Sequence, residues 1–377
     1  MQFSEIIGQD DTRQLLLRAV QTNHLAHALL FDGPEGSANL ALALALAQYV
    51  NCEDRQGSGT PDADACGRCA SCVKMQKLVH PDLHLVFPVA NLARGKTSEA
   101  YLTEFRAFIL DQPYRTLPDW LDRMGADNKQ GNISAEEARQ ILQKLSLKAY
   151  EGAYKIMLIW LPELMNVASA NALLKVLEEP PAQTLFLLVT NQPDKLLITI
   201  LSRTQRVALR AFTDGDVATY LRQHRNLDET TARRLAYLAD GNLADALHLS
   251  TQTGTADEHT WFAEWMRDCY RQDLAKLVKQ AEQFDGFSKE KQKGLFDYSI
   301  RLCRDVFLWQ QGAGELLRLP DDELAFVKNF AKVLSTAHVE RIVADLNQGA
   351  YHLERNARAR MVLLDLSLTF ARLIRQG

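Results

Sequence analysis

The stretch Ala28-Leu29-Leu30-Phe31-Asp32-Gly33-Pro34-Glu35-Gly36-Ser37-Ala38-Asn39-Leu40 decides the fold, because it joins an apolar, strand-like run to a segment rich in alanine and leucine. Gly33 and Gly36 are placed as in a phosphate-binding loop (P-loop) between a strand and a helix. A working loop needs a lysine for the phosphates and a Ser or Thr hydroxyl for Mg²⁺, but Asn39 and Leu40 occupy those positions. The stretch therefore predicts the fold of an ATPase without its chemistry. A plain strand-to-helix turn is the alternative.

The chain has 377 residues, which exceeds the size of one hydrophobic core and predicts two or three domains. Its composition, 47% hydrophobic and 24% charged, is that of a globular protein, and its formal charge of −4 gives no overall basic field for a nucleic acid. The apolar runs are shorter than the about 20 residues that cross a bilayer, and the N-terminus has no basic stretch before an apolar one. We therefore expect a cytoplasmic protein.

Four of the six cysteines lie in one short segment rich in Gly, Asp and Ser. They are Cys52, Cys66, Cys69 and Cys72, with the spacing C-x13-C-x2-C-x2-C. Thiolate ligands at such spacing are typical of a closed, tetrahedral, structural zinc site, so we expect Zn²⁺ here and no catalytic metal. Disulfide pairs, or His80 in place of one sulfur, are the alternatives. Cys269 and Cys303 are expected to be small buried side chains.

Strand-like and helical patterns alternate up to about residue 210, as an α/β domain requires. The predicted strands are 28–32, 83–87, 154–161, 185–190 and 205–209. They predict a parallel sheet with helices on both faces. We interpret the segment at about 91–130, of mixed helix and loop, as an insertion of unassigned role. Helices are expected from Ser134 to about Tyr150 and over Asn171–Glu179, where two prolines end the second helix.

The strand predicted at 154–161 is a second test of ATPase chemistry. In a P-loop ATPase this strand ends in the acids that hold Mg²⁺ and activate water. Here it ends Ile159-Trp160-Leu161-Pro162, and the acid that follows, Glu163, is expected to be a solvated first-turn helix residue. Because two catalytic elements are missing together, the sequence favours an inactive ATPase fold over a chance turn.

Several motifs follow one another in an order that resembles the AAA+ clamp-loader subunits of bacterial DNA polymerase III. They are Ile7-Gly8-Gln9, His27 to Pro34, the four cysteines, His80-Pro81-Asp82, Ala170 to Pro181, and Leu201-Ser202-Arg203-Thr204. The resemblance covers most of residues 1–250, and the run from Asn171 to Pro181 is its most specific part. Within the family the chain looks most like the non-hydrolysing subunit with a modified P-loop, rather than the ATP-hydrolysing gamma/tau subunit.

This resemblance implies a subunit that helps load the sliding clamp onto primed DNA within the DNA polymerase III holoenzyme. Its implied partners are the gamma/tau and delta subunits, with the clamp and primer-template DNA reached through the complex and no membrane contact. No intrinsic ATPase is expected, because the degenerate P-loop of Gly33, Gly36 and Asn39 would not support hydrolysis of ATP.

The family's Ser-Arg-Cys motif corresponds here to Ser202-Arg203-Thr204, and the family's arginine reaches across a subunit interface toward the γ-phosphate held by a neighbour. A planar, permanently charged guanidinium stabilises charge on a transferring phosphoryl group. The resemblance therefore implies that Arg203, with Ser202, acts as an arginine finger in trans. The alternative is a surface arginine that caps helix carbonyls or pairs with an acid, and Arg206 is a substitute candidate.

Three domains are expected: an AAA+ α/β domain at 1–211, a small helical lid at 212–254 and an all-α domain at 255–377. Short amphipathic helices are predicted at 214–224, 229–239 and 244–250, and helical periodicity continues beyond a linker at 251–256. In the lid, Ala244 stands where the family's ATPases carry a nucleotide-contacting arginine. The resemblance implies that the third domain is an oligomerisation collar.

Two other functions remain open from the sequence. An active, gamma/tau-like ATPase subunit is disfavoured by Asn39, Leu40, Trp160 and Ala244. A zinc-dependent DNA-binding module is suggested by the cysteines alone, and their segment mixes basic with acidic residues rather than forming a basic surface.

Overall fold

The computed structural model describes residues 1–60, 62–92, 95–126, 129–146, 148–251, 255–317, 319, 321–355 and 357–376. The chain forms two compact units, Met1–His248 and Leu249–Gly377, and each is described by itself. The separate lid and collar domains stay predictions. Within the predicted linker at 251–256, residues 252–254 lie outside the described ranges.

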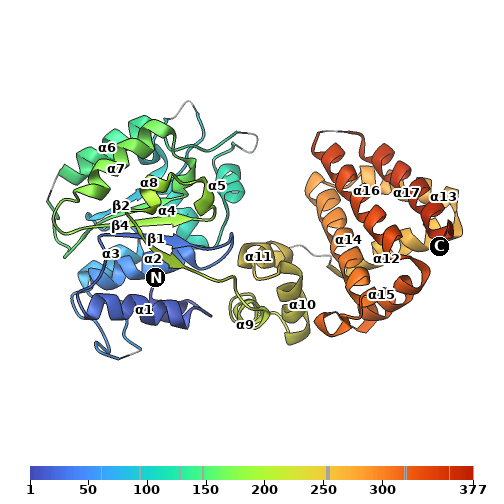
Figure 1. Cartoon of the computed structure of the whole chain (residues 1–377), viewed down its shortest axis with the longest axis horizontal. Helices are drawn as coiled ribbons and strands as arrows, with labels where there is room; N and C mark the ends of the chain where they lie inside the picture. The colour runs from blue at the N-terminus through green and yellow to red at the C-terminus, as the bar shows by residue number, and fades with distance from the viewer. Residues whose placement is uncertain are drawn as a thin grey trace. The chain divides into compact units, whose positions relative to one another are not determined.

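Five parallel strands form one sheet in the first unit, in the order β2-β3-β4-β1-β5 (Figure 1). They are β1 (Ala28–Asp32), β2 (Leu83–Val86), β3 (Lys155–Trp160), β4 (Thr184–Thr190) and β5 (Gln205–Ala208). In the centre of the sheet, Leu30 lies opposite Leu188 of β4 and Arg206 of β5. The predicted α/β class and parallel sheet are confirmed, and each strand end lies within one residue of its expected position.

Helices cover both faces of the sheet, because alternate strand residues point to opposite sides. On one face the strands share a core with α6, α7 and α8. These helices span Ala135–Ser146, Val167–Glu178 and Ile198–Leu201, and short 3-10 turns stand at η3 (Pro162–Leu164) and η4 (Pro193–Lys195). On the other face α2 (Asn39–Val50) contacts β1, β3 and β4. Figure 1 shows α6 and α7 on the side of the sheet opposite α2.

The helix α2 has no solvent-facing side, and all 12 of its residues are buried. The sheet covers one side of the helix. The rest is covered by α1 (Asp10–Gln21), α3 (Ala70–Gln76) and the N-terminal turn η1 (Phe3–Glu5). Phe3 lies edge-on to Tyr49 with 5.9 Å between ring centroids. The alternating alanines and leucines of this helix therefore suit burial on every side.

The predicted insertion folds as helices joined by loops. Its described residues include η2 (Ser98–Tyr101), α4 (Leu102–Asp111) and α5 (Leu117–Arg123). Their aromatic side chains join a cluster with the ends of β2 and β3. The members are Phe87, Phe105, Phe108, Trp120 and Trp160. Because Trp160 is the last residue of β3, this cluster fixes the insertion beside the carboxyl edge of the sheet.

The helix predicted to reach Tyr150 instead ends at Ser146. Asp82 explains the difference, because its carboxylate accepts hydrogen bonds from the N–H groups of Tyr150, Glu151 and Gly152 at 2.6, 2.9 and 2.7 Å. Burial opposes the charge of Asp82, but these bonds favour the carboxylate and its pKa is lowered. The chain is thus held in a turn before β3.

Three helices follow β5 along the chain, α9 (Asp214–Arg225), α10 (Glu229–Ala239) and α11 (Leu243–Thr251), and the first unit ends within α11 at His248. Their bounds agree with the predicted helices to within one residue. An ion pair joins α11 to the insertion, since His248 Nε2 lies 2.9 Å from Asp119 Oδ1 of α5. This pair raises the pKa of His248, chiefly through the hydrogen bond to Asp119. The charge of Asp245 adds to the rise, and burial and Arg115 oppose it.

The second unit is all helical in its described part, as predicted. Its elements are α12 (Thr255–Arg271), α13 (Leu274–Asp285), α14 (Lys289–Gln310), η5 (Gly314–Leu316), α15 (Asp321–Val333), α16 (Thr336–Glu354) and α17 (Ala359–Gln376). The core is aromatic, with Phe262, Trp265 and Phe296 fully buried, and Cys269 and Cys303 are buried in it as expected. Among the described helices of the chain, none is long and apolar enough to span a membrane.

Replacing His248 with alanine removes the ion pair between α5 and α11. Because the pKa of His248 is raised in the folded chain, the pair stabilises the fold below the ordinary value of 6.5. That stabilisation is lost as the pH rises through the raised pKa. We expect the variant's melting temperature to lie about 1–3 °C below wild type near pH 6 and to match it near pH 9. Thermal unfolding at several pH values measures this difference.

The control is His24→Ala, which changes an exposed histidine of the same unit. This variant should track wild type at every pH. A destabilisation of His248→Ala that grows with rising pH would contradict the assigned sign.

Candidate functional site

The loop predicted as a P-loop, between β1 and α2, is largely buried, although Pro34 and Glu35 are exposed. Gly33 and Gly36 to Leu40 are buried, and Ser37 and Asn39 expose only 2% and 6% of their surface. Gly36 has a left-handed φ of +71° and is so close to the segment before α11 that a Cβ there would lie 1.8 Å from Asn242 Oδ1. The loop backbone also accepts a hydrogen bond from Leu243 N to Gly36 O at 3.2 Å. The segment before α11 thus packs directly on the loop.

The side chain of Asn39, where a P-loop lysine would stand, is bonded entirely within the protein. Its Nδ2 donates to Asn191 Oδ1 at 2.7 Å and to the carbonyls of Thr190 and Gly33 at 3.3 and 3.5 Å. Its Oδ1 accepts from Leu40 N at 2.9 Å, one of the N–H groups at the start of α2. Asn39 therefore joins the loop to β4 and occupies a donor that a bound phosphate would use.

Glu163 differs from its prediction as a solvated residue. Leu161 adopts a left-handed φ of 56°, which turns the chain after β3 into η3. The Glu163 carboxylate consequently faces β4, where it accepts from Thr190 Oγ1 at 2.8 Å and Asn191 N at 3.1 Å. Burial raises the pKa of Glu163, although these bonds work against the rise. The carboxyl edge of the sheet thus carries a polar network of Asn39, Asn191, Thr190 and Glu163.

The two remaining positions of ATPase chemistry are apolar and buried. Trp160 ends β3 inside the aromatic cluster of the insertion, with its ring 5.5 Å from Phe105. Ala244 in α11 exposes only 2% of its surface. Trp160 therefore offers no carboxylate for a metal, and Ala244 offers no cation for a phosphate.

The four predicted cysteine ligands come together. Their sulfur atoms, on Cys52, Cys66, Cys69 and Cys72, all lie within 4.8 Å of one another. Four sulfurs around one zinc ion, each at about 2.3 Å, would stand about 3.8 Å apart, and Cys66 Sγ and Cys72 Sγ are 3.9 Å apart. The donor set and its spacing fit one tetrahedrally held metal ion.

The surroundings of the cluster favour a thiolate at Cys66, whereas burial raises the pKa values of Cys52 and Cys72. Cys66 N donates to Cys52 Sγ at 3.2 Å, and Cys69 N and Cys72 N donate to the preceding cluster sulfurs at 3.3 Å each. Burial opposes ionisation of Cys66, but the backbone N–H groups of Arg68 and Cys69 and the neighbouring thiols lower its pKa to about 7. Such N–H···S bonds stabilise the negative charge that a metal ligand carries.

Neither alternative to a four-sulfur site is supported. All six cysteines are free, so no disulfide is present. His80 lies outside the cluster, because its Nδ1 accepts a hydrogen bond from Asp82 N at 3.1 Å and its Nε2 lies 3.4 Å from Glu151 Oε1. His80 instead helps to hold the turn at 150–152.

The cysteine loop completes the cover of α2. Arg55, within this loop, donates to the carbonyls of Tyr49 and Val50 at 3.0 and 2.8 Å, which are among the last of the helix. Asp64 accepts from the N–H groups of Phe3 and Ser4 at 3.1 and 2.9 Å and so fixes the N-terminal turn. One end of α2 therefore meets the cysteine loop and the other meets the P-loop.

Arg203 follows directly after α8 and is one-third exposed. Its guanidinium pairs with Glu178 Oε1 at 2.5 Å and donates to Thr199 O at 2.9 Å and to Ser202 Oγ at 3.3 Å. Both alternatives of the sequence analysis, carbonyl capping and pairing with an acid, thus describe Arg203 in the isolated chain. Ser202 Oγ accepts one of these bonds, and the role predicted for the two residues stays a prediction.

The sequence did not reveal the pair formed by Arg206 and Asp32. Asp32 ends β1 immediately before the P-loop, exposes 8% of its side chain and pairs with Arg206 of β5. The only sequence signal is an acid at the end of a fully apolar strand, and its partner becomes visible once β1 and β5 are neighbours. Arg203 and Arg206 are thus both ion-paired within the chain, and Arg206 is the more exposed of the two, at 63% against 33%.

Comparisons with known proteins match this chain to subunits of DNA polymerase III. A family model described as DNA polymerase III, delta subunit, matches residues 8–213. The chain is 29% identical over 342 residues to the DNA polymerase III subunit delta' of Yersinia pestis, covering 89% of this chain and 82% of that protein. It is 26% identical over 255 residues to subunit tau of Bacillus subtilis, covering 66% of this chain and 37% of that protein.

Among solved structures, a DNA polymerase III gamma subunit-related protein of Thermotoga maritima aligns with a TM-score of 0.41 and 14% identity. The alignment covers 97% of this chain and 100% of that one. At that score it adds nothing to the fold described above.

Replacing Asn39 with alanine tests whether this side chain seals the P-loop. The change removes the bonds that Asn39 makes to Leu40 N, Asn191 Oδ1 and Gly33 O, whereas Thr190 O keeps its bond from Gly33 N. Each lost buried bond costs about 1–3 kcal/mol, and we expect the melting temperature of the first unit to fall by about 3–8 °C. Ser37→Ala is the matched control, because Ser37 Oγ is buried and makes no hydrogen bond in the described part of the chain. Equal stability of the two variants would contradict the sealing role.

Proposed function

Because this chain belongs to the family described as DNA polymerase III, delta subunit, we propose that it is the delta-prime-type, non-hydrolysing subunit of a bacterial clamp loader. In this role it assembles with the ATP-hydrolysing gamma/tau subunits and with delta. The complex then loads the sliding clamp onto primer-template DNA. The relatives named delta' and tau support this group of partners. We place the chain in the cytoplasm with the replication machinery.

The single observation that carries the non-hydrolysing role is the way in which Asn39 and Leu40 are bonded and buried in the loop before α2. The position of the phosphate-binding lysine holds Asn39, whose amide is bonded to β4 and to Leu40 N. The hydroxyl that would hold Mg²⁺ is replaced by Leu40, which exposes 2% of its surface. Opening this loop for ATP would break buried hydrogen bonds, and no cation in the loop would repay that cost. An active gamma/tau-like ATPase is disfavoured for the same reason.

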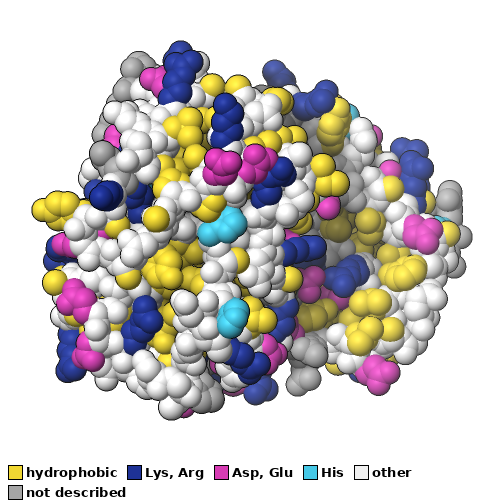
Figure 2. All heavy atoms as spheres, turned by 60° about the vertical axis from the view of Figure 1, so that its left-hand side comes forward, with side chains coloured by type: hydrophobic (Ala, Val, Ile, Leu, Met, Phe, Trp, Pro, Cys, Tyr) yellow, Lys and Arg dark blue, Asp and Glu magenta, His cyan; other side chains and the backbone are white. Residues whose placement is uncertain are grey.

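A zinc-dependent DNA-binding module is disfavoured by the charge pattern. In the cysteine loop, Arg68 pairs with Asp54, and Arg55 is engaged on the end of α2. On the face shown in Figure 2, basic and acidic side chains are interspersed with apolar ones and do not gather by sign. Recognition of the DNA backbone needs a basic face, so we assign DNA contact to the assembled complex.

We also propose a role for each of the three predicted domains. The α/β domain at 1–211 and the lid at 212–254 retain the shape of a nucleotide motor, and the helical domain at 255–377 serves as the oligomerisation collar. This assignment follows from the family rather than from any chemistry of the helical residues.

Arg203 is our candidate for the arginine finger that acts on a neighbour's ATP. Its present partner, Glu178, is about half exposed, and exposed ion pairs contribute only about 0–1 kcal/mol. A phosphate in a subunit interface is a stronger partner for a guanidinium. Arg203 can therefore exchange Glu178 for a neighbour's γ-phosphate at little cost.

Arg203→Ala in a reconstituted clamp loader tests this role. An arginine supplied in trans raises phosphoryl-transfer rates by about 10³–10⁵ in GTPases, but this chain would serve only one of several ATP sites. We therefore expect DNA-stimulated ATP hydrolysis of the complex to fall by about twofold or more, with assembly unchanged by gel filtration. The purified chain alone should show no magnesium-dependent ATP turnover.

Two further variants separate catalysis in trans from a structural role. Glu178→Ala removes the ion pair but keeps the guanidinium, so the activity of the complex should be preserved. Arg203→Lys keeps a charge but not the planar fork, and it should recover only part of the activity. If Glu178→Ala lowers ATP hydrolysis as much as Arg203→Ala does, the arginine acts through the ion pair and not on a neighbour's nucleotide.

We propose that the metal of the four-cysteine cluster is structural Zn²⁺. Four sulfur donors form a closed set with no position for a substrate, and thiolates select zinc over hard cations. The metal would hold the cysteine loop against the carboxyl end of α2.

Metal analysis of the purified chain should find about one zinc per chain. Cys69→Ser removes one ligand from a partly exposed position, so it should lower the zinc content sharply and make the melting temperature sensitive to chelator. Cys303→Ala, which changes a buried cysteine of the second unit, should keep its zinc. A wild-type protein that contains no metal and is as stable as the zinc-loaded protein would contradict the assignment of a structural zinc.

A further inference from the structure

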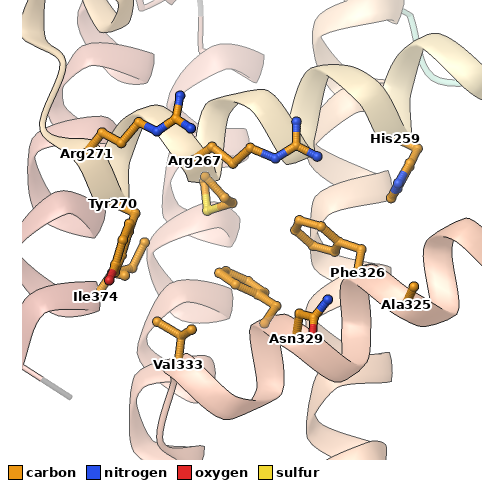
Figure 3. A pocket seen from close by; sticks show the side chains of 11 residues that line it. His259, Arg267, Tyr270, Arg271, Ala325, Phe326, Asn329, Val333 and Ile374 are labelled. Atoms are coloured by element: carbon orange, nitrogen blue, oxygen red, sulfur yellow. The ribbon is translucent and has the colours of Figure 1, made fainter.

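An open groove lies between two helices of the second unit, α12 and α15 (Figure 3). Its volume is about 580 Å³ and its floor is apolar, formed chiefly by Met266, Phe326, Phe330 and Ile374. At one end Tyr270 and Val333 stay 56% and 37% exposed, although both are large apolar side chains. The collar role proposed for this domain assigns no part to these residues, and a function of the groove goes beyond that role.

Two arginines form one rim of the groove. Arg267 and Arg271 lie four residues apart on α12, so they share one face of the helix, and Figure 3 shows both side chains along the same edge. Both are exposed, and in the described part of the chain neither one has an ion pair or other recorded partner. The opposite rim, on α15, carries the uncharged residues Ala325 and Asn329. The groove thus combines an apolar floor with positive charge along one side.

The local charge does not belong to a general basic surface. Residues 249–377 contain 18 Lys and Arg and 18 Asp and Glu, so the unit has no net charge. A nucleic acid needs a wider basic face and gains little from an apolar floor. A ligand that is apolar in the middle and acidic along one edge matches the groove better.

The length of the groove suits a helix. Its lining residues on α12 run from His259 to Arg271, which corresponds to about 18 Å at 1.5 Å per residue. Those on α15 run from Ala325 to Val333, or about 12 Å. Two to three turns of a partner helix cover this distance, and an amphipathic helix lies in such a groove with its apolar residues inward.

We propose that this groove binds an amphipathic helix of a partner protein that carries carboxylates one turn apart beside its apolar face. The two carboxylates pair with Arg267 and Arg271, and the apolar side chains fill the space over Phe326 and Phe330. The ion pairs fix the direction of the helix, because only one edge of the groove is charged.

The test uses the full chain and two synthetic, fluorescently labelled helical peptides of about four turns. Both have leucines at i, i+4 and i+7, and they differ only in the flanking pair at i+1 and i+5, which is glutamate in one and lysine in the other. We expect the glutamate peptide to bind about tenfold more tightly than the lysine peptide at low salt. Fluorescence anisotropy measures both affinities.

Variants of the chain give the sharper result. In Arg267→Glu with Arg271→Glu the preference should invert, so that the lysine peptide binds more tightly. Ala325→Trp should block both peptides by filling the groove. Arg304→Glu, an exposed arginine of α14 outside the groove, should leave both affinities unchanged.

Three outcomes would overturn the proposal. One is equal affinity of the chain for the two peptides, and another is binding that the charge-reversed or groove-filled variants leave unchanged. The third is no binding of either peptide, with sedimentation showing a dimer of this chain that Ala325→Trp dissociates. That result would assign the groove to a second copy instead.

Discussion

The burial of α2 on every side is the constraint on which the rest of the first unit depends. A helix with no solvent face needs partners around its whole circumference and at both ends, because its terminal N–H and C=O groups are also out of water. The sheet, α1 and the N-terminal turn supply the sides. Arg55 of the cysteine loop binds carbonyls at one end, and Asn39 binds an N–H at the other. The cysteine loop and the loop at 33–38 thus cover the two ends of the same buried helix.

Asparagine at position 39 also suits a buried loop better than the lysine of a P-loop would. A P-loop without phosphate would leave a buried ammonium beside backbone N–H groups, which is costly. An asparagine offers both a donor and an acceptor at the same position, and here it uses both. Trp160 plays the matching part on β3, since it replaces a polar strand end by one that packs on the insertion. At this edge of the sheet, Asn39 and Trp160 are therefore buried rather than open to a ligand.

Local sequence patterns predicted the strands, the helices α9 to α11 and the cysteine cluster, because short apolar runs and cysteine spacing carry most of that information. They failed where a distant residue decides the local structure. The helix after Ser134 ends earlier than predicted because Asp82 accepts hydrogen bonds from the N–H groups that would otherwise continue the helix. Glu163 faces inward because Leu161 takes a left-handed turn that no pattern in the sequence announces. Likewise, the pairing of Arg206 with Asp32 needs the strand order, which periodicity does not give.

The contact between Arg203 and Glu178 has a consequence for association. An arginine side chain free in solvent has about 2 kcal/mol of rotamer entropy, part of which is lost when it docks. Here the carboxylate, together with Thr199 O and Ser202 Oγ, already restricts the rotamers of the guanidinium in the free subunit. Any anionic group that replaces Glu178 therefore meets a side chain whose freedom has already been reduced. Dissolved ions screen this pair, so ionic strength governs how well the arginine is pre-organised before it meets a partner.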